Sequence, residues 1–314
     1  MVLSASGLAI VALTTRAVPS DVSPLTGRDL AALRRSIDVT TVAGRAAPDV
    51  AADAGIPLAD AERVLRLLDR STAAALALDT LGQAGIWTTT VADDDYPAGL
   101  RDRLGDAAPP VLHGAGPAVT AAPPLVGVVG SRDVTPEAAE VATATGRLAV
   151  DRGFGVVSGA ARGVDALAMD AARIGGGRAV GVLADSLTRA VRSAEVRRAV
   201  LDGALTLMTP YAPGAGFSAG FAMGRNKIVY ALAAHVLVVT SDLDRGGTWA
   251  GALEALAHRY SDVAVWTGRG AGAGNAALVE RGARGIADVG ALLDGPVLPP
   301  AHRDAGDDQL SFAV

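Results

Sequence analysis

The sequence predicts an α/β protein in which a small N-terminal helical domain precedes a doubly wound, mainly parallel sheet. Two observations carry this prediction. From residue 125 onward, short apolar runs alternate with segments of helical periodicity. Runs that are apolar on both faces are typical of parallel strands covered by helices on each side. Before that point, apolar residues recur at helical spacing and prolines interrupt them.

The N-terminal part is expected to be helical, because apolar residues recur every three or four positions at 28–36, 58–75 and 76–85. The acidic run Asp93-Asp94-Asp95 is expected to form a solvated turn, and the proline-rich stretch after it indicates an interdomain connection. We therefore divide the chain into a helical domain (1–92), a connecting segment (93–124), a sheet domain (125–295) and a flexible acidic tail (296–314).

The predicted sheet domain alternates strands with helices. Strands are expected at residues 125–129, 154–157, 179–183, 205–208, 236–239 and 263–266. Helices are expected at residues 136–151, 164–174, 193–202, 218–234, 250–259 and 275–281. Doubly wound parallel sheets bind their ligands at the carboxyl ends of the strands, so function is expected in the loops that follow these strands.

Composition excludes several classes of function. The chain has 314 residues, no cysteine and four scattered histidines, so disulfide frameworks, thiolate zinc sites and cysteine nucleophiles are excluded and no metal site is expected. No apolar run is long enough to span a bilayer. The apolar run at 8–13 is short and lacks a preceding basic stretch, so we expect a cytoplasmic protein without signal peptide or membrane attachment. We identify no catalytic set of side chains and expect no cofactor.

The charge balance requires that any site for a polyanion be local. The formal net charge is −5, with 28 basic against 33 acidic residues. Such a protein lacks an overall basic field that would attract nucleic acid. Lys227 is the only lysine, so a site for a polyanion is expected in the loops that contain arginine.

The first strand of the predicted sheet ends in a pattern suited to an anion. Gly130, Ser131 and Arg132 follow it and precede a helix. Glycine permits close approach to the backbone, the serine hydroxyl can donate a hydrogen bond, and arginine carries five N–H donors. A helix N-terminus also favours negative charge. The loop lacks the G-x-G-x-x-G spacing of dinucleotide-binding proteins.

The second strand ends in a similar way. Ser158 and Gly159 are followed by Arg162 and Asp165, and a helix begins nearby. Asp165 is suited either to capping this helix or to fixing the Arg162 side chain. Because the carboxyl ends of adjacent parallel strands converge, Arg132 and Arg162 are expected to face one ligand.

Two later segments supply further candidates for phosphate binding. Arg225-Asn226-Lys227 lies in or near the start of a helix, and positions two apart on a helix, such as Arg225 and Lys227, cannot point the same way. Gly246-Gly247-Thr248 opens the next helix and presents N–H groups and a hydroxyl. Four aromatic residues lie near these loops, and core packing is expected for each: Phe217, Phe221, Tyr230 and Trp249.

Together these motifs resemble those of the DNA-processing protein A family (DprA, also called Smf). That family shows Val-Gly-Ser-Arg at a strand end, Ser-Gly-x-Ala-Arg-Gly-Ile-Asp in a turn and Arg-Asn-Arg at a helix start. The corresponding residues here are 129–132, 158–165 and 225–227. The small-residue loop at 246–248 and flanking segments extend the resemblance over residues 93–293.

The resemblance implies a Rossmann-like domain that binds single-stranded DNA, forms a homodimer and helps load a RecA-type recombinase during transformation and recombination, without an essential catalytic step. Carried over by position, Arg132, Arg162, Arg225 and Lys227 would face phosphates. The other expected DNA- or phosphate-binding residues are Gly130, Ser131, Ser158, Gly159, Asp165, Asn226, Gly246, Gly247 and Thr248.

The chain departs from the family pattern at several places. Met169 stands where the family usually has histidine, and Lys227 stands where it usually has arginine, whose planar fork can bind phosphate through two bonds. We also expect this chain to lack the small C-terminal winged-helix domain that many members carry.

Two other classes of function stay open. A nucleotide-binding or nucleotide-hydrolysing enzyme resembling the lysine-decarboxylase-like phosphoribohydrolases would use a glycine-rich helix start and a glutamate. Glu254 is the nearby candidate, although it lies farther from Thr248 than that motif places it. The other class is an interaction module, because Gln309-Leu310-Ser311-Phe312 loosely resembles peptides that bind the bacterial sliding clamp.

Overall fold

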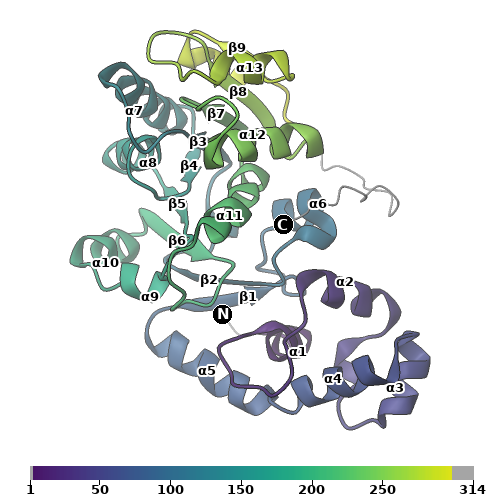
Figure 1. The fold of residues 1–314 in the computed structure, drawn as a ribbon. Helices are drawn as coiled ribbons and strands as arrows, with labels where there is room; N and C mark the ends of the chain where they lie inside the picture. The colour runs from purple at the N-terminus through teal and green to yellow at the C-terminus, as the bar shows by residue number, and fades with distance from the viewer. Residues whose placement is uncertain (1–2, 299–314) are drawn as a thin grey trace.

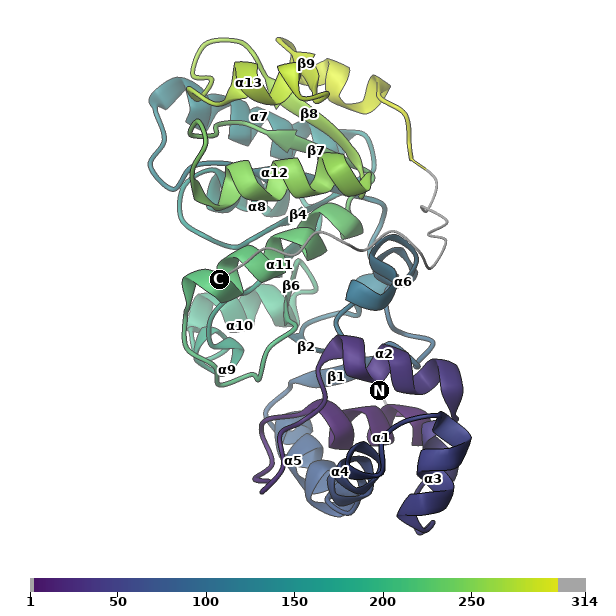
Figure 2. The ribbon, with the colours of Figure 1, turned by 45° about the vertical axis from the view of Figure 1, so that its right-hand side comes forward.

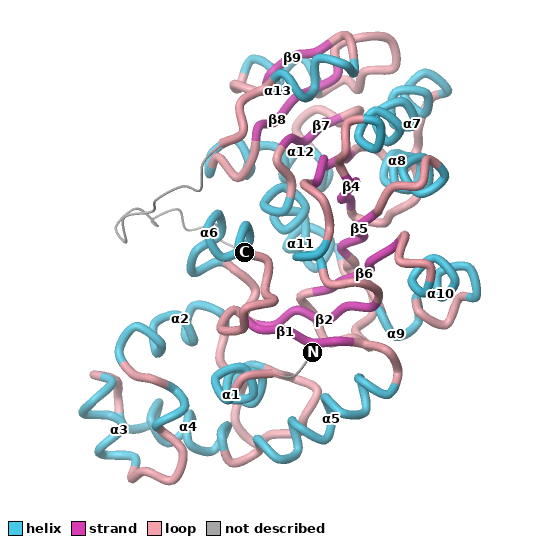
Figure 3. Tube along the Cα trace, turned by 180° about the vertical axis from the view of Figure 1, so that it is seen from behind, coloured by secondary structure: helices cyan, strands magenta, loops and turns pink. Residues whose placement is uncertain are grey.

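The computed structural model describes residues 3–298. Within them, nine strands form one sheet: β1 (Trp87–Thr90), β2 (Val111–Ala115), β3 (Leu125–Val129), β4 (Gly155–Ser158), β5 (Ala179–Val182), β6 (Leu205–Thr209), β7 (His235–Val238), β8 (Asp262–Trp266) and β9 (Arg284–Ile286). Their order is β1-β2-β6-β5-β4-β3-β7-β8-β9, and Figure 3 shows them running through the molecule from end to end. β1 and β2 pair antiparallel with each other, and β2 pairs antiparallel with β6; all other neighbours are parallel.

Helices cover both faces of the sheet (Figure 1). They are α6 (Ala98–Leu104), α7 (Pro136–Asp151), α8 (Val164–Ile174), α9 (Leu187–Ala190), α10 (Ala194–Leu201), α11 (Ala219–Leu232), α12 (Gly246–His258) and α13 (Asn275–Glu280). α7 packs on α8, and α11 packs on α12 across the opposite face. Each helix pair forms an apolar core with the face of the sheet that it covers. Consecutive residues of β4 point into different cores: Val156 packs with α7 and α8, and Val157 packs with α11 and α12. This is the doubly wound, mainly parallel architecture that the sequence predicts.

The positions of β3 to β8 agree with the sequence prediction to within one residue at each end. These strands are buried on both faces, which is why they are visible as short apolar runs. α12 begins earlier than expected, because Gly246 and Gly247 form part of its first turn. The predicted division of the chain at residues 92, 124 and 295 stays a prediction. β1 and β2 lie in the first two of those segments and extend the sheet into them.

The N-terminal helices lie beside β1 at one end of the sheet (Figure 2). They are α1 (Ala5–Thr14), α2 (Gly27–Ser36), α3 (Ala47–Ala54), α4 (Leu58–Leu68) and α5 (Ser71–Gln83). Their apolar residues form a core of their own, to which Val111 of β2 contributes. α1 is apolar on nearly every side, so the run at residues 8–13 has no amphipathic pattern that would predict a helix. None of the helices between residues 3 and 298 has the length and apolarity that a bilayer crossing requires.

The single helix predicted over residues 58–75 is wrong, because the chain bends between α4 and α5. Arg70 lies at the bend and is buried. Its guanidinium donates hydrogen bonds of 2.7–2.9 Å to the carbonyl oxygens of Ala12, Thr15 and Val18. These oxygens lie at and beyond the C-terminal end of α1, where carbonyl groups lack partners within the helix. The bend therefore places Arg70 where it can fix the end of α1.

The prediction that Asp93 lies in a solvated turn is also wrong, since this side chain is buried and joins α1 to β1. One carboxylate oxygen accepts hydrogen bonds from the N–H and hydroxyl of Ser4, at 3.0 and 2.6 Å. The other oxygen accepts from the N–H and hydroxyl of Thr90, at 2.9 and 2.6 Å. Burial alone would raise the pKa of Asp93, but these hydrogen bonds to the charged form outweigh it and lower the pKa.

Asp93→Ala is expected to lower the free energy of unfolding by about 2–4 kcal/mol, because it leaves the donors of Ser4 and Thr90 without their acceptor. The folded-state pKa of Asp93 is depressed, so its contribution is present above the unfolded pKa and is lost as pH falls through the folded pKa. Urea unfolding at pH 7 and at pH 3 should show the difference from the native chain shrinking at the lower pH. Asp94→Ala, at an exposed neighbour, is the control. A difference independent of pH would refute the role of the ionised carboxylate.

Candidate functional site

The carboxyl ends of β3, β4 and β5 border a cavity of about 340 Å³. Its lining comes from the loops after these strands, from the loop before α11 and from α11 itself. The residues are Arg132, Gly159, Ala160, Ala161, Arg162, Leu183, Ala184, Asp185, Phe217 and Arg225. We call this cavity the arginine pocket. It brings together three of the four cationic residues that the sequence analysis selected.

Arg225 is the buried member of the pocket, with 6% of its surface exposed. Its guanidinium occupies the space next to Gly159, where a Cβ atom would overlap it, so only glycine leaves room for it. Among residues 3–298, the buried Nε of Arg225 has no hydrogen-bond partner. Burial lowers the pKa of Arg225, Asp165 opposes this, and the positive charge of Arg132 lowers it further. A buried cation with an unsatisfied donor on a cavity wall is suited to binding an anion.

The charge of Asp165 acts on Arg225, whereas Arg162 pairs with a different carboxylate. The carboxylate lies in the first turn of α8, is buried, and accepts a long hydrogen bond of 3.4 Å from the N–H of Ala161. Burial raises its pKa, while the charge of Arg225 acts in the opposite direction. Arg162 pairs instead with Asp133 at 3.0 Å, so the suggested pairing of Asp165 with Arg162 is wrong.

Phe217 is an exposed aromatic residue of the pocket, contrary to the expectation of core packing. It lies in the loop between β6 and α11 and is 55% exposed. The guanidinium carbon of Arg132 is 5.4 Å from the centre of its ring, within the range of a cation–π contact. The loop is braced by stacking of Tyr211 on Phe221, with ring centres 4.0 Å apart. Phe217 therefore presents part of its ring to solvent beside an arginine.

The serine and threonine residues predicted for the site hold the loops together and lie outside the lining of the arginine pocket. The N–H of Ser131 donates to the hydroxyl of Thr240 at 2.8 Å, which joins the ends of β3 and β7. The hydroxyl of Thr248 donates to the carbonyl oxygen of Gly130 at 3.2 Å, which joins α12 to the same loop. The Ser158 hydroxyl donates to a carbonyl oxygen of β3 at 2.6 Å. These bonds fix the positions from which the arginines extend.

Lys227 lines a different cavity, of about 290 Å³, between α11 and α12. Asn226 and Glu254 also line it, and the amide of Asn226 donates to the carbonyl oxygen of Gly247 at 2.9 Å. The expectation that Arg225 and Lys227 point in different directions agrees with this geometry. Three arginines, without Lys227, thus converge on the arginine pocket.

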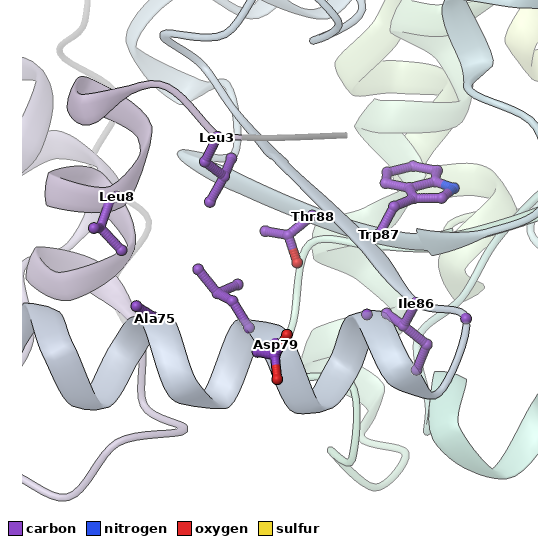
Figure 4. Close-up of a pocket in the computed structure, with 10 residues that line it drawn as sticks. Leu3, Leu8, Ala75, Asp79, Ile86, Trp87 and Thr88 are labelled. Atoms are coloured by element: carbon purple, nitrogen blue, oxygen red, sulfur yellow. The ribbon is translucent and has the colours of Figure 1, made fainter.

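A larger cavity of about 500 Å³ lies between α1, α5 and β1. Figure 4 shows residues that line it, among them Leu3, Leu8, Ile86 and Trp87. Two of its polar side chains have partners: Asp79 accepts a hydrogen bond from Gln83 at 2.7 Å, and Thr88 bonds to His113 at 2.9 Å. No basic side chain of the described residues lines this cavity, so it is less suited to an anion than the arginine pocket.

The fold and the pocket define a class of protein: a Rossmann-like α/β protein with an arginine-lined pocket at the carboxyl ends of its parallel strands. The family model of DNA recombination-mediator protein A matches residues 87–295. The chain belongs to this family, and the resemblance inferred from its motifs is confirmed.

A curated relative agrees with this family assignment. A DNA processing protein DprA of Mycobacterium tuberculosis (strain H37Rv) is 34% identical over 217 residues, which cover 63% of this chain and 54% of that protein. The chain thus spans about half the length of this curated relative.

Two solved structures share the fold. DNA processing protein A of Streptococcus pneumoniae matches with a TM-score of 0.70 and 20% identity, over 94% of this chain and 98% of that one. A structure describing the single-stranded DNA binding mode of DNA processing protein A from Helicobacter pylori matches with a TM-score of 0.55 and 22% identity, over 67% and 96%. At these identities the matches establish the Rossmann-like fold.

Gly159→Ala is expected to lower the free energy of unfolding by about 1–3 kcal/mol, because the new methyl group collides with the Arg225 guanidinium. In an Arg225→Ala background most of this cost should disappear. Urea unfolding of the four proteins of this double-mutant cycle measures the coupling. Gly216→Ala is the control, since a Cβ there meets nothing within 4 Å. An equal cost of Gly159→Ala in both backgrounds would mean that the two residues do not share this space.

Proposed function

We propose that this protein binds single-stranded DNA through the arginine pocket and, as a homodimer, helps to load a RecA-type recombinase during DNA uptake and recombination. The observation that carries the DNA-binding part is the convergence of Arg132, Arg162 and Arg225 on one cavity. Membership of the DNA recombination-mediator protein A family supports it.

The pocket suits the phosphate groups of nucleic acid. Guanidinium groups bind phosphate oxygens through paired, charge-assisted hydrogen bonds. Arg225 has an unsatisfied Nε among the described residues, and Arg132 is exposed. Arg162 pairs with Asp133, but the two side chains are 73% and 87% exposed, so this ion pair is weak and a phosphate can replace it.

Phe217 favours a single strand over a duplex. Exposed aromatic rings bind single strands by stacking on their bases, which is possible because those bases are not held in a duplex. The ring of Phe217 is more than half exposed and lines the same cavity as the arginines. The relative from Helicobacter pylori is a single-stranded DNA-binding protein of the same fold, which supports this choice.

The recombinase, the homodimer and the role in transformation rest on the family resemblance. Pull-down of a RecA-type recombinase and measurement of the mass in solution test the first two. The suggested contact with a sliding clamp concerns residues 309–312, which lie outside the described residues. Pull-down of the clamp with and without residues 307–314 tests that contact.

The enzymatic alternative has less support from the geometry. Glu254 lines the cavity that contains Lys227, whereas the three arginines line another, so this glutamate does not share a cavity with the arginines. Release of free base from nucleoside monophosphates, abolished by Glu254→Ala, would favour the enzyme instead.

Arg132→Ala is expected to weaken binding of single-stranded DNA for all sequences alike. Three arginine–phosphate contacts at about −0.7 each predict a slope near −2 for the logarithm of affinity against that of salt, and the variant should flatten it by about 0.7. Fluorescence anisotropy with single-stranded and duplex oligonucleotides over a salt series measures this. Arg152→Ala, an exposed arginine outside the pocket, is the matched control. Unchanged affinity and slope would remove Arg132 from the interface.

Phe217→Ala is expected to weaken single-strand binding by about 1–3 kcal/mol, roughly 5- to 150-fold, if one base stacks on the ring. The salt slope should not change, because the ring carries no charge. The same anisotropy assay separates this effect from that of Arg132→Ala. Met223→Ala is the control, since Met223 is equally exposed but lines the other cavity. An affinity that Phe217→Ala leaves unaltered would exclude stacking at this position.

A further inference from the structure

The arginine pocket carries more positive charge than one internal phosphate of a strand requires. Its lining holds the guanidinium groups of Arg132, Arg162 and Arg225 and, among the described residues, one carboxylate, that of Asp185. Asp185 is itself paired with Arg189 at 2.6 Å. An internal phosphodiester has a single negative charge, whereas a phosphomonoester carries about −1.5 to −2 at pH 7. The charge of the pocket therefore matches a phosphomonoester more closely.

The carboxylates of Asp133 and Asp165, which lie near the pocket, do not cancel its positive charge. Asp133 and Arg162 are 87% and 73% exposed, so water and salt weaken their pairing and a phosphate can displace Asp133 from Arg162. Asp165 is buried beside Arg225, and burial opposes its charged form, although the guanidinium acts in the other direction. Arg225 keeps a buried Nε without a partner among the described residues, so part of its hydrogen-bonding capacity remains available to a ligand in the pocket.

The guanidinium groups of Arg132 and Arg225 also favour a ligand with more than one charge. The positive charge of Arg132 acts against that of Arg225, which is buried and lacks a partner for Nε among residues 3–298. A phosphomonoester offers three acceptor oxygens, so one group can bind both side chains at once. Such binding replaces repulsion between the two cations by attraction of each to the ligand.

The size of the cavity limits what enters it. About 340 Å³ lies near the lower end of the range for small-molecule sites, which is about 300–1,000 Å³. Proteins that hold a strand along its length instead use grooves that follow several nucleotides, about 4–16 per domain in one well-studied fold. The arginine pocket is therefore suited to one nucleotide, with its phosphate at the arginines and its base near Phe217.

We propose that the arginine pocket binds a nucleoside that carries a terminal phosphomonoester in preference to an internal phosphodiester. The ligand is either the phosphorylated end of a DNA strand or a free nucleoside monophosphate, which present the same chemistry. This inference rests on the proposed DNA-binding role of the same pocket and specifies which part of a strand the pocket takes.

The test compares one single-stranded oligonucleotide sequence in four forms: with 5′-phosphate, with 3′-phosphate, with hydroxyl groups at both ends, and circularised. Unlabelled forms compete with a labelled strand in fluorescence anisotropy, beside dAMP, deoxyadenosine and the methyl phosphodiester of dAMP. We expect a phosphorylated end to improve affinity at least fivefold over the hydroxyl-ended and circular forms. We also expect Arg132→Gln to reduce this preference to below twofold, while Arg152→Ala keeps it.

The competitors distinguish the sources of the phosphomonoester. Displacement by dAMP, but not by deoxyadenosine or the methyl diester, would identify a free nucleotide as a ligand, whereas a preference confined to phosphorylated strands would identify the strand end. Equal binding of all four strands, with no displacement by dAMP, would overturn the inference while single-strand binding stands. Binding of dAMP without binding of any strand would support the inference and refute the proposed function. A lack of binding by every ligand would refute both.

Discussion

The buried guanidinium of Arg225 is the constraint on which the site depends. It occupies the space that Gly159 leaves at the end of β4, and the charges of Asp165 and Arg132 both act on it. Burying a cation whose Nε lacks an acceptor among the described residues costs stability. An anion bound in the pocket would recover part of that cost, so the proposed binding would be coupled to stability at one side chain.

Much of the fold follows from residue patterns within single segments. Strands β3 to β8 are buried on both faces and therefore stand out as short apolar runs. The parts that the sequence did not predict depend on partners far away in the chain. β2 lies in a proline-rich segment and is a strand because it pairs with β1 and β6. The break before α5 depends on carbonyl oxygens of α1 and the loop after it, which bind Arg70 across more than fifty positions.

At the candidate site, too, some features follow from local sequence patterns and others depend on distant parts of the chain. Convergence of Arg132 and Arg162 could be predicted, because adjacent parallel strands end at one edge. Spacing on a helix showed that Arg225 and Lys227 diverge, but it could not show which of them enters the pocket. Phe217 looked like a core residue because aromatic side chains usually are, and only the course of the loop before α11 exposes it. Asp93 looked solvated because its partner Ser4 lies 89 positions away.

Because the chain has more acidic than basic residues, a local basic pocket matters more for the binding of a polyanion. With a net charge of −5, the surface as a whole offers little long-range attraction to a polyanion. Under the proposed function, affinity for DNA would come from short contacts, and a charge as buried as that of Arg225 is screened less by salt than an exposed one. The proposed interaction would hold a strand at one point, not along a basic surface. In the proposed homodimer, two such points on one strand would raise affinity through effective concentration, without any additional contact within a protomer.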